Sequence, residues 1–284
     1  MSKFTAAVVQ LSSGVDMQAN IEAMEQGIRA AAADGATYIQ TPEMTGLVQQ
    51  KRKPFFETIR EEADDPVGPA ASQLAKELGV TVHVGSTPIR VGDQMAANRA
   101  YLYGPNGELR ASYDKIHMFD VDLANGESWR ESAVYQPGTK GVTVDMDGAL
   151  IGLAICYDCR FPELHTAYAR LGVEVLTGPS CFTRQTGKAH WHALLRSRAI
   201  ENGAYMIAAA QGGDLEDGRE TYGHSIIINP WGEVIAEVKG EKPGIALAEI
   251  DTLQVAQARD RIPNLVNNRT FSIINSSGDA ENVA

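Results

Sequence analysis

One cysteine stands where an apolar strand is predicted to turn into a helix. Residues 150–155 read as a buried strand, Cys156 follows directly, and Pro162 is typical of the first turn of a helix. Backbone N–H groups at a helix N-terminus favour a thiolate and a developing oxyanion, so Cys156 is a candidate nucleophile. Because a free thiol is mostly protonated at neutral pH, such a nucleophile needs a base and a cation. The same pattern also fits an inert buried thiol.

Two further charged residues follow predicted strands. Glu43 comes after the strand 37–40 and the dipeptide Thr41-Pro42, and Lys115 comes after the strand 109–113. A carboxylate at a strand end is a candidate general base, and an ammonium group could lower a thiol pKa and bind an oxyanion. Taken alone, each of the two residues is equally compatible with an ordinary surface charge.

The cysteines and histidines allow other interpretations. Cys156 and Cys159 have the spacing of a thioredoxin-like redox pair. A zinc site would need a second pair of ligands, and the remaining candidates, Cys181 and the sequence His190-x-His192, supply it poorly because the two histidines point in different directions on a helix. We therefore expect no metal.

The histidines are not needed for the chemistry proposed for Cys156. His83 is predicted to lie buried in a strand. The other histidines are interpreted as structural groups or as residues of a pocket rim, namely His117, His165, His190, His192 and His224.

Strands and helices alternate in the first part of the chain and hairpins dominate later. Hydrophobic periodicity predicts helices at 17–33, 68–78, 161–171, 188–202 and 253–261. Strands are predicted at 4–11, 37–40, 81–86, 99–103, 109–113, 142–146, 150–155, 173–177, 204–210, 225–229, 234–238 and 245–250. Asn106-Gly107 and Asp147-Gly148 are good hairpin signals. The pattern predicts an α/β domain of two mixed sheets faced by helices.

Composition excludes several classes of protein. The 284 residues are 44% hydrophobic, which is too apolar for a disordered chain and enough for a large core. A formal charge of −11 argues against partners that are nucleic acids or anionic membranes. We expect no membrane span and no signal peptide, and three cysteines favour a reducing, cytoplasmic location over a disulfide framework.

Several segments together resemble the nitrilase superfamily of carbon–nitrogen hydrolases, specifically its Nit branch of small amidases. The resemblance covers about residues 4–265. It is carried by the segments TPEM, YDKIHMFDVD, CYDCRFPEL, TGKAHWHALLRSRAIENGAYMIAAAQ, YGHSIIINPWGEV and GIALAEID. It implies a four-layer α-β-β-α sandwich, a hydrolase domain over 1–275 and a frayed tail over 276–284. It also implies catalysis without a cofactor and a homodimer or larger homo-oligomer.

The resemblance also assigns roles to residues. It implies a Glu43-Lys115-Cys156 triad with an assisting glutamate, which is Glu131 or, alternatively, Glu127. Lys115 and the backbone N–H of Tyr157 would bind the oxyanion. The substrate would be held by Arg160, Phe182 and Thr183. Arg160 could instead form a salt bridge with Asp158 or Glu163.

The implied activity is hydrolysis of a small amide that carries a carboxylate or a 2-oxo group, through a thioester, with release of ammonia or an amine. The subgroups of deaminated-glutathione amidase and omega-amidase resemble the chain most. Two departures from the family pattern concern specificity or subunit contacts: His192 replaces a glutamate, and Asn267-Asn268 replaces Arg-Arg. The alternatives are an N-carbamoyl amidohydrolase or nitrilase with the same triad, and a silent scaffold of the same fold.

Overall fold

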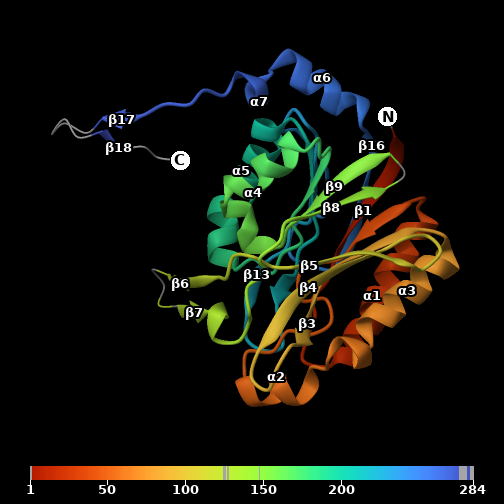
Figure 1. Cartoon of the computed structure of the whole chain (residues 1–284). Coiled ribbons are helices and arrows are strands. Elements are labelled where there is room, and N and C mark those ends of the chain that lie inside the picture. The colour runs from red at the N-terminus through yellow and green to blue at the C-terminus, as the bar shows by residue number, and fades with distance from the viewer. Residues whose placement is uncertain (1, 124–125, 127, 147, 275–279, 282–284) are drawn as a thin grey trace.

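The computed structural model describes residues 2–123, 126, 128–146, 148–274 and 280–281. Two six-stranded mixed sheets lie face to face and helices cover their outer faces (Figure 1). The first sheet has the order β16-β1-β2-β3-β4-β5 and the second the order β15-β14-β11-β10-β9-β8. The predicted four-layer α-β-β-α sandwich is confirmed.

The elements have the following bounds. The strands of the first sheet are β1 (Lys3–Gln10), β2 (Tyr38–Gln40), β3 (Thr81–Arg90), β4 (Ala96–Tyr103), β5 (Leu109–Asp114) and β16 (Gly244–Asp251). Those of the second are β8 (Val142–Met146), β9 (Ala149–Leu153), β10 (Val175–Thr177), β11 (Tyr205–Ala208), β14 (Ile226–Ile228) and β15 (Val234–Glu237). Short strand pairs are β6 (Asp120–Asp122) with β7 (Ser128–Arg130), β12 (Gly212–Asp214) with β13 (Glu220–Tyr222), and β17 (Ile273–Ile274) with β18 (Ala280–Glu281). The helices are α1 (Met17–Ala33), α2 (Arg52–Thr58), α3 (Val67–Leu78), α4 (Pro162–Arg170), α5 (Arg184–Asn202), α6 (Leu253–Arg261) and α7 (Asn264–Asn267), with 3-10 turns η1 (Glu62–Asp64), η2 (Glu131–Ala133) and η3 (Cys156–Arg160).

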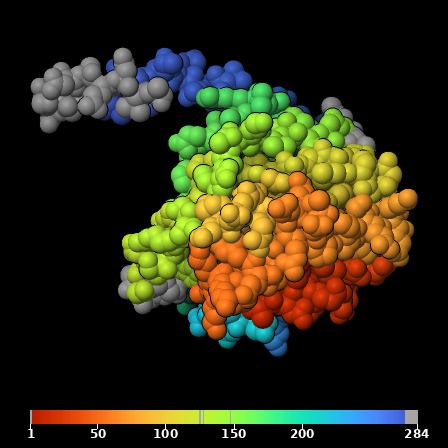
Figure 2. All heavy atoms as spheres, turned by 60° about the horizontal axis from the view of Figure 1, so that its bottom comes forward, coloured from red at the N-terminus to blue at the C-terminus, as the bar shows by residue number. Residues whose placement is uncertain are grey.

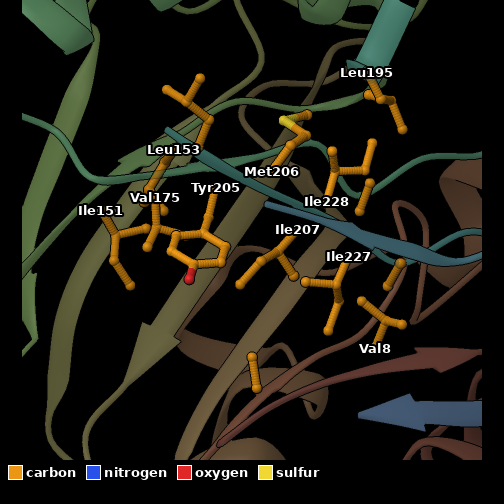
Figure 3. Packing of buried hydrophobic residues seen from close by; sticks show 14 of the residues in the cluster. Val8, Ile151, Leu153, Val175, Leu195, Tyr205, Met206, Ile207, Ile227 and Ile228 are labelled. Carbon is orange, nitrogen blue, oxygen red and sulfur yellow. The ribbon is translucent and has the colours of Figure 1, made fainter. Parts of the chain in front are cut away.

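The alternation of side chains along buried strands explains the layers. In β1, Ala7 and Val9 pack with the apolar faces of α1 and α3, whereas Val8 belongs to the core between the sheets. The second sheet alternates in the same way. Ile207 and Ile227 point toward the side on which Val8 lies, and their neighbours in the strands point toward Leu195 of α5 (Figure 3).

The carboxyl ends of four strands meet at one region of the two sheets. In the first sheet β2 runs parallel to β3, and β5 has the same direction because β4 is antiparallel to both β3 and β5. In the second sheet β9 and β10 are parallel. Residues that follow β2, β5, β9 and β10 within four positions are therefore brought together, as in other open α/β sheets. Glu43, Lys115, Cys156 and Cys181 are such residues.

The structure corrects several predicted boundaries. Helix α2 was not predicted, since Pro54 lies in its first turn and the segment is short. Helix α5 begins at Arg184, four residues before the predicted start, because Thr183 caps it by accepting a hydrogen bond from the N–H of Thr186. Strand β3 continues to Arg90 through a register shift between Val84 and Thr87.

Residues 268–274, which follow α7, project from the body (Figure 2). In this segment Ile273–Ile274 pairs with Ala280–Glu281, and the rest of the predicted tail over 276–284 lies outside the described residues. Among the helices of the described ranges, none has the length and apolar character needed to cross a bilayer.

Gly85 in β3 allows the two sheets to approach each other beside the strand ends. A Cβ at this position would lie 2.6 Å from the carbonyl carbon of Pro42 and in closer contact with Thr41 O and Pro179 Cβ. We expect Gly85→Ala to lower the free energy of unfolding in urea by about 1–3 kcal/mol or more, because backbone must move. Gly92→Ala, whose Cβ would meet nothing within 4 Å, should change it by less than about 1 kcal/mol. Equal effects of the two substitutions would show that Gly85 carries no packing constraint.

Candidate active site

Cys156 lies on a strained turn between β9 and η3. Its φ is +47°, in the left-handed region that non-glycine residues rarely adopt, and its N–H donates to the carbonyl of Pro179 at 2.9 Å. The side chain is 8% exposed and lines a cavity of about 770 Å³. Tyr157 follows in the first turn of η3, where the backbone N–H groups lack acceptors within the helix itself. The turn therefore presents both a thiol and a donor to the cavity.

Glu43 is held on both carboxylate oxygens. Oε1 accepts hydrogen bonds from Lys115 Nζ and from Asn98 Nδ2, both at 2.9 Å, and Oε2 accepts one from the backbone N–H of Cys181 at 2.7 Å. Its own carbonyl accepts from Gln211 Nε2 at 3.0 Å. The side chain is 3% exposed. A carboxylate so fixed keeps one orientation toward the cavity, as a general base requires.

Lys115 lies between two carboxylates. Besides Glu43, its Nζ donates to both oxygens of Glu131, at 2.9 and 2.8 Å. Glu131 is itself held by the backbone N–H of Phe119 at 2.6 Å and by Asn98 Nδ2 at 3.3 Å. The structure thus brings Glu43, Lys115, Glu131 and Cys156 to one cavity. Glu127, the alternative to Glu131, lies outside the described residues.

Electrostatics keep the lysine charged and the thiol neutral. Burial opposes the charge of Lys115, but the carboxylates of Glu131 and Glu43 outweigh it and hold the pKa of the ammonium group well above its ordinary value. Burial, followed by the negative charge of Glu43, raises the pKa of the Cys156 thiol well above its ordinary value, although Lys115 acts in the opposite direction. The resting nucleophile is therefore a thiol whose proton must be removed as it attacks.

Asp158, which sequence reasoning did not assign to the site, joins the turn that carries Cys156 to the loop after Lys115. Its buried carboxylate accepts hydrogen bonds from the backbone N–H and Nδ1 of His117, at 3.0 and 2.6 Å. The other oxygen accepts from Tyr113 Oη at 2.7 Å and from the N–H of Ile155 at 2.9 Å. These bonds hold the pKa of Asp158 below its ordinary value despite burial. Asp158 is a positioning residue for both segments.

Three of the four remaining site predictions fall on the cavity wall. Tyr157, Phe182 and Thr183 line the cavity. Arg160 does not. Its guanidinium contacts His190 Nδ1 at 3.3 Å and lies over the rings of Tyr157 and Phe182. Its role in binding substrate stays a prediction.

Sequence reasoning also missed Asn98, Trp129 and Arg219. Asn98 is the buried amide of β4 whose side chain contacts both glutamates, and the sequence AANRAYLY of this strand does not single it out. Trp129 of β7 and Arg219 of the turn between β12 and β13 both line the cavity, with the guanidinium carbon 5.2 Å from the centre of the indole ring. No local motif could have placed these two side chains together.

The cysteines are free, and Cys159 lies buried, where desolvation raises the pKa of its thiol to about 12.

Among the described residues, one group could hold a metal ion. It consists of His192, His224 and Glu237, whose ligand atoms lie within 4.8 Å of one another. Glu237 Oε1 accepts from both imidazoles, at 3.0 and 2.8 Å. This group does not line the cavity around Cys156.

Comparisons with known proteins show the family of the chain. The model of the carbon–nitrogen hydrolase family matches residues 5–260. A deaminated glutathione amidase of Synechocystis sp. is 39% identical over 274 residues, which are 93% of this chain and 98% of that protein. The human omega-amidase NIT2 is 34% identical over 263 residues, 93% of this chain and 94% of that protein.

A solved structure shares the fold. The NitFhit protein of C. elegans superimposes with a TM-score of 0.88 and 31% sequence identity over 95% of this chain. The match spans 66% of the NitFhit chain, which is longer.

The environment of Cys156 predicts opposite effects of two substitutions on its pKa. Glu43→Gln removes the negative charge that raises the thiol pKa, so we expect the pH midpoint of iodoacetamide alkylation at Cys156 to fall. Lys115→Met removes the compensating positive charge and should move the midpoint upward. Peptide mass spectrometry locates the label, and circular dichroism reports folding.

The exposed Glu57→Gln serves as the control for these substitutions, with no expected change in the alkylation profile. Shifts of Glu43→Gln and Lys115→Met in the same direction would contradict the arrangement of charges described here.

Proposed function

The chain belongs to the carbon–nitrogen hydrolase family and is an amidase, and we propose that it cleaves its amide through a thioester on Cys156. The observation that carries the proposal is that the buried residues Glu43, Lys115 and Cys156 and the partly buried Glu131 line one cavity. Its base is a carboxylate already fixed by three donors, and its nucleophile is a protonated thiol.

Acylation begins when Glu43 takes the thiol proton as the sulfur attacks the amide carbonyl carbon. The tetrahedral oxyanion accepts hydrogen bonds from Lys115 Nζ and from the N–H of Tyr157. Donors placed in this way stabilise the transition state by roughly 3 kcal/mol each. The C–N bond then breaks as Glu43 passes its proton to the nitrogen, and ammonia or an amine leaves with the acyl group bound to sulfur.

Deacylation reuses the same groups. Glu43 takes a proton from water, the resulting hydroxide attacks the thioester carbonyl, and the C–S bond breaks as the proton returns to sulfur. Glu131 touches neither Cys156 nor Glu43 through a hydrogen bond that the structure describes, and we assign it to fixing Lys115. The mechanism uses only side chains and backbone of this chain.

For the substrate, we propose a small linear amide that bears a carboxylate or a 2-oxo acid group. Support comes from the names of the relatives, a deaminated glutathione amidase and an omega-amidase. The cavity also contains positive side chains beside the apolar rings of Phe119, Trp129 and Tyr135. N-carbamoyl compounds and nitriles are the alternative substrates.

We further propose that the chain acts as a homodimer. Ile200 of α5, Trp231 and Ile262 are each about half exposed and surround one shallow apolar pocket. Burial of such a patch against a second copy would remove large apolar side chains from water. Light scattering after size exclusion should give twice the 30.6 kDa chain mass, and Trp231→Glu should reduce it. A monomer at micromolar concentration would contradict this proposal.

The thioester predicts two measurable behaviours. Ammonia should be released from at least one member of a panel containing 2-oxoglutaramate, deaminated glutathione, N-carbamoyl acids, simple amides and nitriles. Added hydroxylamine should divert the acyl group to a hydroxamate, because it attacks the same thioester as water. Cys156→Ala and Lys115→Ala should lower ammonia release by at least about 10³-fold, while Cys159→Ser keeps it. Turnover by Cys156→Ala, or its loss in Cys159→Ser, would reject Cys156 as the sole nucleophile.

A further inference from the structure

Four cationic side chains line the cavity among the described residues, and three of them already donate hydrogen bonds to other groups of the protein. Lys115 is bound by two carboxylates. The guanidinium of Arg130 donates to both oxygens of Asp122, at 2.9 and 2.8 Å, and to the carbonyl of Val121. Arg52 donates to the carbonyls of Ala133 and Gln94 and to the side chain of Gln94. The fourth cation is Arg219.

Arg219 is held in place on one edge and on one face. Its Nε lies 3.0 Å from Oδ2 of Asp217, a carboxylate that is 1% exposed, and the planar group lies over the indole ring of Trp129. Among the described residues, Asp217 is the only carboxylate paired with this guanidinium. An arginine presents five N–H donors in a rigid fork, so the pair at Nε leaves donors for a ligand.

Arg219 lies near the residues that are proposed to react. It lies against Cys181, whose backbone N–H holds Oε2 of Glu43. The loop that carries Arg219 is closed by hydrogen bonds from the N–H of Leu215 to the carbonyl of Arg219 and from the N–H of Arg219 to Asp217 Oδ1. A substrate whose amide reaches Cys156 thus meets this cation inside the same cavity.

We infer that Arg219 binds the carboxylate of the substrate, with Trp129 as the platform beneath its guanidinium and Asp217 as the residue that orients it. The inference rests on the proposed amidase function and gives it a specificity residue. A guanidinium binds a carboxylate through two parallel N–H···O bonds, and a partly desolvated site strengthens them. The preferred substrate is accordingly a linear amide with an anionic group remote from the scissile bond.

Arg160 is the competing candidate, and a matched pair of substitutions separates the two. The assay compares kcat/KM for succinamate, a linear amide with a terminal carboxylate, with that for neutral butanamide. Arg219→Met should lower the succinamate-to-butanamide ratio by about 10- to 100-fold, which corresponds to loss of charge-assisted hydrogen bonds, mainly through KM. Arg219→Lys should restore part of the ratio, and Arg160→Met should leave it within about 3-fold. An unchanged ratio in Arg219→Met, or a selective loss in Arg160→Met, would overturn the inference.

A binding measurement tests Arg219 independently of turnover. In the Cys156→Ala chain, glutarate should bind and change the fluorescence of Trp129, whose ring lies under the guanidinium. The Cys156→Ala/Arg219→Met chain should bind glutarate at least about 10-fold more weakly, whereas Cys156→Ala/Arg160→Met should match Cys156→Ala. Equal binding by all three chains, or none by any, would refute the assignment. If the unmodified chain releases no ammonia from these amides but glutarate binding still depends on Arg219, the proposed substrates are wrong and the role of Arg219 stands.

Discussion

The site depends on one buried ammonium group held between a buried carboxylate and a partly buried one. Burying a charge is costly unless it is paired and hydrogen-bonded, and a single unpaired partner would be destabilising. Lys115 satisfies Glu43 and Glu131 at once, and Asn98 contacts the same two carboxylates. Asn98 and Lys115 belong to the first sheet and its strand ends, whereas Glu131 lies in η2, so their pairing holds η2 against the first sheet. Cys156, the nucleophile, follows β9 of the second sheet.

This charge arrangement has a consequence for the resting enzyme. Burial, together with the negative charge of Glu43, raises the pKa of Cys156 and keeps the sulfur protonated, whereas oxidation and alkylation proceed through the thiolate. The same carboxylate that limits the reactivity of the free thiol removes its proton when an electrophilic carbonyl is bound. The geometry thereby couples nucleophilicity to occupation of the cavity.

The positions of the strands and the turn at Cys156 were predictable because hydrophobic periodicity and strand ends are local signals. Because Glu43, Lys115 and Cys156 each follow a predicted strand, local signals made each of them a candidate, whereas the resemblance to the nitrilase superfamily joined them into a triad. The two-sheet architecture follows from the same alternation that buries Val8 on one side and Ala7 on the other.

Other features lie beyond local patterns. Helix α2 contains a proline and is too short to show periodicity. Asp158 is one charged residue in the sequence CYDCR, and only the three-dimensional structure shows that it accepts four hydrogen bonds. Arg160 was predicted from the family resemblance, whereas Arg219, a cation on the cavity wall, comes from a loop 59 residues further along the chain.

The contact between Cys181 and Glu43 uses the main chain of residue 181. Any amino acid except proline supplies that N–H, so catalysis does not dictate which side chain stands there. Yet this side chain lines the cavity beside Arg219. Residue 181 is thus a position at which paralogues could diverge in substrate preference through single exchanges while the hydrolytic apparatus persists intact.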